Sequence, residues 1–471
     1  MKILPVYFEM NLDSVSSQEY HSSFLVSTRR HVLMITNHGV HDWDIVPGAP
    51  DTGGQNVFVN QFADVLVKHG FKITIVNRGG YLHPVTGMKQ QGLKYKNADQ
   101  RILYIEDGLP EFVHKEDMHE RIDFLVESLH IFLASEGLPV DLLISHYWDA
   151  AMIGIKYNAQ LSTRVRHIWV PHSLGTLKRR NVQPSLWDDL RIEERIKVER
   201  SLIKKIDGVV STSPTIKQTL EDDYGYTTPE IFLPPCVDED RFYPRAVSDD
   251  NVVWQFLSQH SGLPVEQVRK SSIVTEISRT DTTKRKKILI EALAKLLPRK
   301  PNILLLVSID DKQKELSLEL NSLIRSNNLE SHTAVVGSVW EILPILYSIS
   351  DVYCTPSIME GFGMSAQEAA ASGIPVVASS LVPFAKEYLL GTQAEKIFYA
   401  KRDDKYILLG EGAIIVQPDD VQGFAYALEL LLSDTDLKNR MGKKAYDITI
   451  PYFTWDNKIV DFFQAIGEEF D

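Results

Sequence analysis

The chain has 471 residues, 44% of them hydrophobic and 24% charged, a composition typical of soluble globular domains and not of disordered chains. Its 50 basic and 63 acidic residues give a formal net charge of −13, which argues against nucleic acid as a partner, because duplex-binding proteins carry a basic footprint. The length exceeds what one hydrophobic core ordinarily holds, so two or three domains are expected.

Membrane insertion and secretion are not expected from this sequence. No apolar run reaches the ~18 residues that a membrane-spanning helix needs, and residues 1–30 lack the sustained apolar stretch of a signal peptide. The two cysteines, Cys236 and Cys354, are too few for a disulfide framework and predict buried thiols in a reducing compartment. We therefore expect a cytoplasmic protein with no membrane span.

Strands and helices are predicted to alternate from residue 32 onward. The apolar run 32–36 predicts a strand, and a loop rich in Gly, Pro and Asp follows it. Apolar residues at helical spacing predict a helix over 55–69, and 73–76 is the next strand. This order is the unit of a parallel α/β fold. It continues with a helix at 121–135 and with strands at 101–105, 142–145, 167–170 and 208–213.

The character of the chain changes after Pro234 and Pro235. Residues 237–271 are polar with scattered Pro and Gly, which is typical of a linker with a helix. A second alternating series follows, with strands at 273–277, 303–307, 333–336, 352–354 and 376–378 and helices at 288–297, 316–327, 342–349 and 365–371. A last amphipathic helix is predicted over 457–470.

Two doubly wound, Rossmann-like domains are the predicted α/β architecture. The predicted division is an N-terminal extension (1–30), a first domain (31–240), a linker region (241–270), a second domain (271–452) and a C-terminal helix returning to the first domain (453–471). Ligands of such sheets bind beyond the carboxyl ends of the strands. With two such domains facing each other, the site is expected in the cleft between them.

The strongest functional signal is the segment 360–368, Glu-Gly-Phe-Gly-Met-Ser-Ala-Gln-Glu, which joins a predicted strand to a helix. The start of that helix offers unpaired N–H groups and a positive dipole to an anion, and Gly361 and Gly363 allow a ligand to approach the backbone. The carboxylates of Glu360 and Glu368 suit the hydroxyl groups of a sugar and a ribose. A capping pattern with surface charge is the alternative interpretation.

Two glutamates around Gly-Phe-Gly resemble the donor-site motif of retaining glycosyltransferases of family 4, which have the GT-B fold of two facing Rossmann-like domains and a C-terminal crossover helix. The resemblance implies that Glu360 contacts the donor sugar and that Glu368 holds the nucleotide ribose. The loop between them would complete the donor site with Gly361, Phe362, Gly363 and Met364.

A second part of the resemblance is the segment 278–284, Ser-Arg-Thr-Asp-Thr-Thr-Lys. It resembles the Arg-x4-Lys pair of the family, which implies that Arg279 and Lys284 clamp the donor diphosphate. Two cations there would neutralise the charge that builds on the leaving nucleotide. Arg285 stands where the family commonly has glycine, and Arg285 and Lys286 could be mistaken for Lys284. A basic helix start is the plainer alternative.

A third part is the segment 51–55, Asp-Thr-Gly-Gly-Gln, at the start of the helix predicted over 55–69. Its place resembles the glycine loop of the family, which implies that Gly53 and Gly54 pack against the donor diphosphate and that Gln55 lies beside the acceptor. The distance of this loop from the first strand suggests a flexible lid. A plain helix-start turn is the alternative.

The acceptor side resembles the sucrose-phosphate and mannosylfructose-phosphate synthase branch of the family. The segment 170–178, Val-Pro-His-Ser-Leu-Gly-Thr-Leu-Lys, implies that His172 faces the sugar near the reacting carbon and that Ser173 contacts the acceptor. Tyr147, in Ser-His-Tyr-Trp-Asp-Ala at a strand end, belongs to a related acceptor segment. A lone histidine is more often structural than catalytic, so the role of His172 depends on this motif.

The same branch acts on phosphorylated acceptors. The resemblance implies that three cations from separate segments, Lys115, Lys178 and Arg195, converge on the acceptor phosphate. Spacing alone does not show this convergence. Three solvated cations are the alternative, above all for Arg195 on its charged helix.

The resemblance further implies transfer with retention by front-side attack, in which the protein supplies positioning and charge stabilisation. The sequence carries no metal-ligand cluster, so no metal and no cofactor are expected to be required, the nucleotide sugar being a substrate and a divalent cation at most stimulatory.

The substrates are predicted from the branch alone. The segments around Tyr147 and 51–55 look closest to the branch that uses GDP-mannose, so the leading prediction is mannosyl transfer to fructose 6-phosphate or glucosyl-3-phosphoglycerate in compatible-solute synthesis. The alternatives are glucosyl transfer from UDP- or ADP-glucose to fructose 6-phosphate, a sugar-nucleotide epimerase of the same architecture, and an inactive binding protein. A dinucleotide oxidoreductase is disfavoured, because the first strand–helix turn lacks G-x-G-x-x-G.

Overall fold

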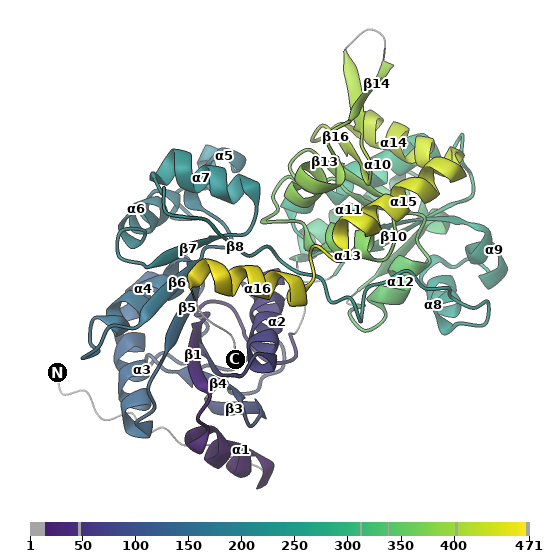
Figure 1. Cartoon of the computed structure of the whole chain (residues 1–471). Helices are drawn as coiled ribbons and strands as arrows, with labels where there is room; N and C mark the ends of the chain where they lie inside the picture. The colour runs from purple at the N-terminus through teal and green to yellow at the C-terminus, as the bar shows by residue number, and fades with distance from the viewer. Residues whose placement is uncertain (1–14, 46–48, 311–312, 338, 401–403, 468–471) are drawn as a thin grey trace. The chain divides into compact units, whose positions relative to one another are not determined.

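The computed structural model describes residues 15–45, 49–310, 313–337, 339–400 and 404–467. The chain forms two compact units, Met1–Pro234 with Ile459–Asp471, and Pro235–Lys458. Each unit contains one eight-stranded sheet with helices packed on it (Figure 1).

The first unit is built on a sheet of order β3-β4-β2-β1-β5-β6-β7-β8, parallel except where β3 meets β4. Its central strands are buried along nearly their whole length, as expected for a parallel sheet covered on both faces. The strands are β1 (Arg30–Ile35), β2 (Phe71–Arg78), β3 (Gly92–Asn97), β4 (Gln100–Ile105), β5 (Leu142–His146), β6 (Arg166–Val170), β7 (Gly208–Ser211) and β8 (Ile231–Phe232).

The helices of this unit cover the sheet with their apolar residues. Those of α3 and α4 pack with Leu33, Ile35 and Leu103 of the sheet into one core cluster. The helices are α1 (Val15–Val26), α2 (Gly54–Lys68), α3 (Ile122–Glu136), α4 (Trp148–Asn158), α5 (Gly175–Asn181), α6 (Ile192–Leu202) and α7 (Pro214–Tyr224), with 3-10 turns η1 (Met118–Arg121) and η2 (Pro184–Leu186).

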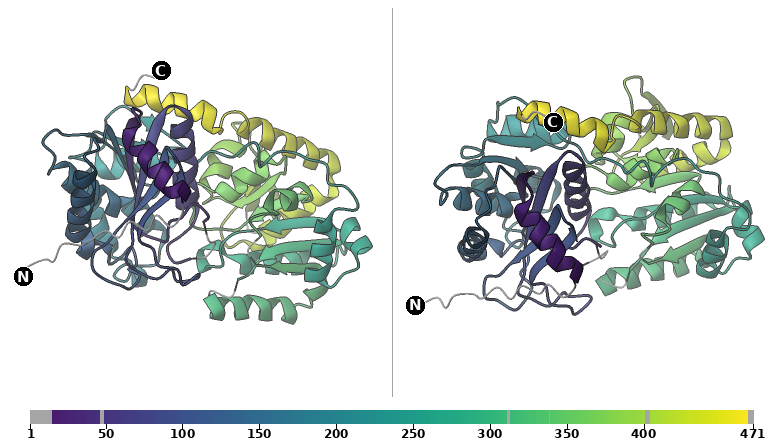
Figure 2. Two further views of the ribbon diagram at one scale, coloured as in Figure 1. Left: turned by 90° about the horizontal axis from the view of Figure 1, so that it is seen from below. Right: turned by 60° about the horizontal axis from the view of Figure 1, so that its bottom comes forward.

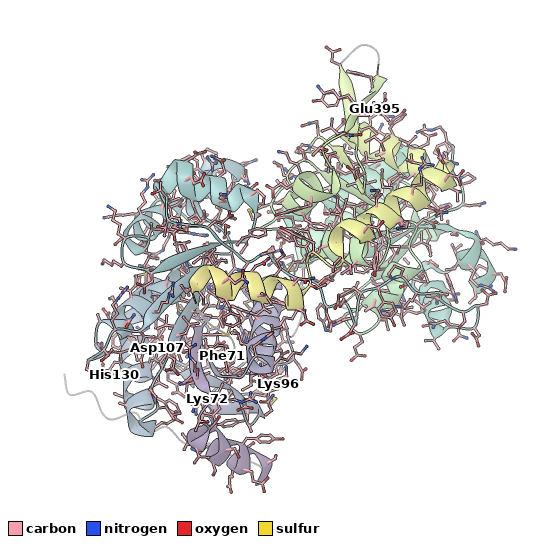
Figure 3. The ribbon with its side chains drawn as sticks, in the orientation of Figure 1. Phe71, Lys72, Lys96, Asp107, His130 and Glu395 are labelled. Atoms are coloured by element: carbon pink, nitrogen blue, oxygen red, sulfur yellow. The ribbon has the colours of Figure 1, made fainter. Side chains whose placement is uncertain are left out.

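The two ends of the described chain both pack on this first sheet. Helix α1 lies beside β3 (Figures 1 and 2), and Lys72 of β2, labelled in Figure 3, donates to the carbonyl of Phe24 at 3.1 Å. The last helix, α16 (Trp455–Ile466), brings Phe462 against Phe62 of α2, with ring centroids 5.3 Å apart. Within the predicted extension 1–30, residues 15–30 therefore belong to the first unit, and the predicted C-terminal helix returns to it.

The second unit has the strand order β11-β10-β9-β12-β13-β16-β15-β14. Its first six strands are parallel, and β14 and β15 form an antiparallel hairpin that extends from the sheet (Figure 1). The strands are β9 (Ser272–Glu276), β10 (Ile303–Ser308), β11 (Thr333–Val336), β12 (Val352–Thr355), β13 (Val376–Ser379), β14 (Glu395–Ala400), β15 (Lys405–Leu409) and β16 (Ala413–Val416).

The helices of the second unit include two that the sequence suggested as a linker. Val253, Leu257 and Val268 of α8 and α9 lie in the same core cluster as β9 and β12, so 241–270 is a packed part of this unit and not a linker. The helices are α8 (Val252–Ser261), α9 (Val265–Lys270), α10 (Lys286–Leu296), α11 (Lys314–Ser326), α12 (Leu343–Ser348), α13 (Met364–Ala371), α14 (Val421–Ser433) and α15 (Thr435–Thr449), with short turns η3 (Thr282–Lys284), η5 (Glu330–His332) and η6 (Ala385–Leu389).

Cys236 and Cys354 are both buried thiols, as predicted. Within the described ranges, no helix has the length and apolar character to cross a bilayer.

Candidate active site

Parallel pairing of β5 with β6 brings two predicted acceptor residues together in the first unit. His146, the last residue of β5, is paired with Val170 of β6, so the residues that follow both strands lie at one edge of the sheet. Tyr147 and His172 follow them and take φ values of 79° and 54°, in the left-handed region that residues with a Cβ seldom adopt. Such conformations are common in functional sites, where the surrounding structure enforces them.

His172 contacts the ring of His146. The two ring planes are inclined by 26° with centroids 5.2 Å apart, and His172 Nε2 lies 3.0 Å from His146 Nδ1. Burial lowers the pKa of His172 to about 3, and nearby His38 adds to the effect. His172 is therefore neutral at physiological pH and suited to hydrogen bonding with a ligand.

Arg195 is an anchor for the predicted acceptor site. Its side chain is buried, with 3% exposed, and its Nε donates to Glu199 at 2.7 Å. One Nη group donates to the Tyr147 hydroxyl, and the other donates to the Ser173 carbonyl at 2.6 Å and to its Oγ at 3.0 Å. The alternative of a solvated Arg195 is therefore wrong, and this guanidinium fixes Tyr147 and Ser173 in place.

Lys115 is paired with the segment that opens α2. Its Nζ forms an ion pair with Asp51, and its backbone N–H donates to the same carboxylate at 3.1 Å. Burial alone would lower the pKa of Lys115, but Asp51 and Glu116 raise it to about 12. Burial alone would raise the pKa of Asp51, but Lys115 lowers it to about 2. The glycine segment and the Lys115 loop are thus joined by one carboxylate.

The loop that carries Lys115 is fixed by a buried ion pair that the sequence did not reveal. Arg78, at the end of β2, donates from Nε and Nη2 to Asp107 at 2.9 Å each, and to the carbonyls of Leu109 and Glu111 at 3.0 Å. Asp107, labelled in Figure 3, lies two residues after the end of β4. Arg78 ends one buried strand and Asp107 comes shortly after the neighbouring one, and this pattern of opposite charges at strand ends could have indicated the pair.

Lys178 lies on α5 and is half-buried. Its ammonium group makes no hydrogen bond or ion pair with any residue that the structure describes, unlike the charged groups of Lys115 and Arg195. Burial lowers the pKa of Lys178 to about 8, and the positive charges of Arg195 and Lys115 contribute. Arg195 and Lys115 thus lie near enough to Lys178 to lower its pKa, against the carboxylates of Glu116 and Asp51, and an anion placed there would raise that pKa again.

The residues of the glycine segment lie at the start of α2. Gly53 is the N-cap, where its N–H donates to Asn56 Oδ1 at 2.9 Å, and Gly54 is the first helical residue. Gln55 Nε2 donates to Thr36 Oγ1 at 3.2 Å, just after β1. The flexible lid predicted for this loop falls partly on residues 46–48, outside the described residues.

In the second unit, the loops after β9 and β12 bring the predicted donor residues together. The Thr283 carbonyl accepts from the Ile358 N–H at 2.9 Å, which ties the two loops. Lys284 is 7% exposed and donates from Nζ to Glu360 Oε1 at 2.6 Å. Arg279 has 59% of its side chain exposed, and among the described residues its guanidinium forms one ion pair, with Asp281 at 3.7 Å. This site thus presents one exposed cation and one cation held by a carboxylate.

The neighbours of Lys284 are engaged elsewhere. Lys286 is buried and donates to Glu276, to the Ser278 carbonyl at 3.0 Å and to Ser308 Oγ at 3.1 Å. Arg285 pairs with Asp419 at 3.1 Å. Neither can take the place of Lys284 without breaking these contacts.

The Gly-Phe-Gly loop is shaped by tight packing. Gly363, the N-cap of α13, has φ 107°, and a Cβ there would lie 2.7 Å from Val382 Cγ1. The Phe362 ring is 3% exposed and packs on Phe384, with centroids 5.4 Å apart, so its backbone and not its ring can meet a ligand. Gly361 is exposed and Met364 half-buried, at the start of α13.

Glu368 lies one turn inside α13 and is half-buried. Tyr347 donates its hydroxyl to Glu368 Oε2 at 3.5 Å. Burial raises the pKa of Glu368 to about 7, against the opposing influence of Arg241 and of the Tyr347 hydrogen bond. Arg241, which stacks on Trp340 at 4.0 Å, is a neighbour of this carboxylate that sequence analysis missed.

The pKa of Glu368 predicts a pH dependence for nucleotide binding. The ionised carboxylate is the better acceptor for ribose hydroxyls, and it is lost as the pH falls below about 7. We expect the dissociation constant of the free nucleotide to rise between pH 8 and pH 6 in the native enzyme. In Glu368→Gln, the dissociation constant measured by calorimetry should change with pH only as far as the nucleotide itself titrates. Parallel pH profiles for the two proteins would contradict the ribose contact.

No group of three His, Cys, Asp or Glu side chains able to hold a metal ion was found within the described ranges. Independence of metal remains a prediction.

Comparison with known proteins places this geometry in context. A family model for glycosyl transferases group 1 matches residues 265–448, and one for glycosyltransferase family 4 matches residues 52–241. Mannosylfructose-phosphate synthase of Agrobacterium fabrum is 30% identical over 362 residues, covering 74% of this chain and 75% of that protein. D-inositol 3-phosphate glycosyltransferase of Corynebacterium jeikeium is 25% identical over 409 residues, covering 85% and 88%.

A solved structure shares the fold over most of the chain. Sucrose-phosphate synthase from Thermosynechococcus elongatus has a TM-score of 0.75 at 23% identity, covering 93% of this chain and 98% of that chain. This likeness confirms the predicted two-domain α/β fold of the GT-B type.

Proposed function

The chain belongs to glycosyltransferase family 4, and on that premise we propose that it transfers a hexose, with retention, from a nucleotide sugar to a small phosphorylated acceptor. As a glycosyltransferase it needs a nucleotide-sugar donor and an acceptor. The side chains of this protein directly support one part of the proposal, namely that the acceptor carries a phosphate.

Lys178 is the observation that carries the phosphate. It is a half-buried cation with no partner among the described residues, and it interacts with Lys115 and Arg195 in a chain of net charge −13. Partial burial and the two neighbouring cations outweigh the carboxylates of Glu116 and Asp51, since together they lower the pKa of Lys178 to about 8. A phosphate dianion would offset that cost. The two relatives named above bear phosphate in the names of their product or acceptor, which agrees with this assignment.

Mannose from GDP-mannose is the donor that we propose first, and fructose 6-phosphate or glucosyl-3-phosphoglycerate the acceptor, in the synthesis of compatible solutes. The 30% identity to mannosylfructose-phosphate synthase supports this choice. Glucosyl transfer from UDP- or ADP-glucose to fructose 6-phosphate is the second candidate. Cytoplasmic location is part of the proposal, because the buried thiols Cys236 and Cys354 suit a reducing compartment.

In the proposed mechanism each group acts by position and charge. Arg279 and Lys284 would neutralise the leaving diphosphate, and Lys284 would shift from Glu360 toward it when the donor binds. Glu360 would then accept from the donor sugar, and Glu368 from the ribose. His172, neutral and held by His146, would hydrogen-bond the sugar near the reacting carbon. The leaving phosphate would take the acceptor proton in a front-side displacement.

The experiment that tests the proposal is a matrix of GDP-mannose, UDP-glucose and ADP-glucose against fructose 6-phosphate, glucosyl-3-phosphoglycerate, inositol phosphate and their dephosphorylated forms. Nucleotide release gives the rate, and NMR of the product gives the anomeric configuration. We expect one donor with a phosphorylated acceptor to dominate and the configuration to be retained. Equal rates on the dephosphorylated acceptors would overturn the phosphate assignment, and an inverted product would overturn retention.

Removal of divalent metal should leave turnover within about twofold of its original value. Arg279 and Lys284 are proposed to neutralise the leaving diphosphate, as a metal ion does in other enzymes with phosphate leaving groups. Assays with excess EDTA against added Mg²⁺ give the comparison. Loss of activity in EDTA that Mg²⁺ restores would show that a metal is required.

A further inference from the structure

We propose that His146 sets the tautomer of His172, so that His172 carries its proton on Nδ1 and donates it in a hydrogen bond to the sugar. His146 is then a positioning residue of the transfer reaction. The inference rests on the proposed contact of His172 with the substrate and adds which of its nitrogens bears the proton.

The first step is the hydrogen bond between the two rings. His146 Nδ1 and His172 Nε2 are 3.0 Å apart. The rings are inclined by 26° with centroids at 5.2 Å, and Phe58 meets the His172 ring edge-on at 5.1 Å. A ring held on two sides has little freedom to turn, so Nε2 stays directed at His146 and Nδ1 is the nitrogen left for a ligand. Within the described part of the chain, Nδ1 of His172 has no hydrogen-bond partner.

The second step is the charge of the pair. Burial lowers the pKa of His146 well below its ordinary value, with His172 and His41 adding to the effect, and burial lowers that of His172 to about 3. Both rings are therefore neutral at physiological pH. Between two neutral imidazoles, one nitrogen donates the shared hydrogen and the other accepts it.

The third step decides the direction of the bond. If His172 donated from Nε2, His146 would have to carry its own proton on Nε2. That atom is buried and has no hydrogen-bond partner among the described residues. A buried N–H without an acceptor is rarely tolerated, and an unused acceptor is tolerated more often. The favoured arrangement therefore has His146 donating from Nδ1, which leaves His172 with its proton on Nδ1.

The consequence is a fixed polarity at the reacting sugar. His172 presents an N–H that stays neutral across the working pH range, so it recognises a sugar oxygen as an acceptor. A ring free to exchange tautomers would divide its population between donor and acceptor forms, and only one form would fit the transition state. His146 thus contributes to turnover without touching the substrate.

The direct test is NMR of the full chain with ¹⁵N-labelled histidine, in which two-bond couplings identify the tautomer of each ring. We expect His172 to have a protonated Nδ1 and a bare Nε2, with its signals assigned by their loss in His172→Gln. A protonated Nε2 on His172 would overturn the inference, whatever the activity. The measurement uses native protein and so does not depend on any His146 variant folding.

Two variants at His146 give the kinetic test. Asparagine can place an amide N–H where Nδ1 lies, and leucine cannot. We expect His146→Leu to lower kcat roughly 10–100-fold, as for the loss of partners that orient a reacting group, with the acceptor KM little changed, and His146→Asn to recover most of kcat. Equal losses in the two variants would overturn the role of His146 as a donor.

His167→Leu is the matched control. His167 is also buried, on the neighbouring strand β6, but its Nε2 bonds to Ser145 Oγ at 2.8 Å and not to His172. The His167→Leu variant should have a lower thermal stability without a selective loss of kcat. A selective loss of kcat in His167→Leu would count against the proposed role of His146. A protonated Nδ1 on His172 together with full kcat in His172→Ala would instead refute the proposed role of His172 in transfer, leaving the tautomer assignment correct.

Discussion

Replacing Lys284 with alanine is expected to lower kcat by about 100-fold or more, because the variant loses a charge that is proposed to stabilise the leaving diphosphate in the transition state. Lys284 is nearly buried and is positioned by its ion pair with Glu360. The measurement is steady-state turnover at saturating donor and acceptor.

The controls for Lys284 come from its own neighbourhood. Lys287→Ala removes an exposed lysine of α10, whose nearest carboxylate is Glu319 at 3.8 Å, and should leave kcat unchanged. Lys284→Ala also leaves the Glu360 carboxylate without its cation. The double variant Lys284→Ala with Glu360→Gln removes both charges, so it separates the effect of losing the lysine from the effect of an unpaired carboxylate. Normal turnover in Lys284→Ala would remove this residue from the donor site.

Replacing Lys178 with alanine is expected to lower kcat/KM for the phosphorylated acceptor roughly 5–150-fold, the range for one charge-assisted contact of about 1–3 kcal/mol. The value for the dephosphorylated acceptor and the slow hydrolysis of the donor should hardly change. Comparing both acceptors in both proteins isolates the contribution of the phosphate.

A pH profile sharpens the test of Lys178. Its pKa is lowered to about 8, so the free enzyme loses this positive charge as the pH rises through that value, and kcat/KM for the phosphorylated acceptor should fall above about pH 8. This fall in kcat/KM above about pH 8 should be absent in Lys178→Ala. Arg179→Ala, which removes an exposed cation of the same helix paired with Glu193 at 2.9 Å, should behave like the native enzyme. An identical loss in both variants would point to general electrostatics and not to a phosphate pocket.

The sequence predicted most of the fold because the buried parallel strands carry their own signal. Strands such as Ile303–Ser308 are continuous apolar runs, and their boundaries were predicted within a residue or two. Edge elements were missed where that signal is absent, and one short buried strand, β16 (Ala413–Val416), was missed although it is apolar. The strand β3 reads Gly-Leu-Lys-Tyr-Lys-Asn and is half exposed. The region 241–270 looked like a linker because few apolar residues, among them Val253 and Leu257, fix it to the core.

In the candidate site too, some residues could be recognised from the sequence and others could not. Lys284 and Glu360 each stand in a short motif, so both could be named as candidates from the sequence, and the structure brings them within 2.6 Å of each other. Their roles remain predictions. The contacts that shape the acceptor side could not be predicted, since Arg78 and Asp107 are separated by 29 positions, and His146 and His172 by 26, and each pair meets only in the folded sheet. Their partners are chosen by tertiary packing, which leaves no local pattern in the sequence.

The arrangement around Arg195 has a consequence for how acceptor preference can change. One guanidinium holds Tyr147, Ser173 and Glu199, and Glu199 in turn accepts the Gly175 N–H at 2.9 Å. A substitution at any of these positions disturbs all of them, so they are constrained to vary as a set. Lys178 lies outside this network, so laboratory evolution toward a new acceptor should find its first tolerated substitutions there, with the Arg195 cluster unchanged.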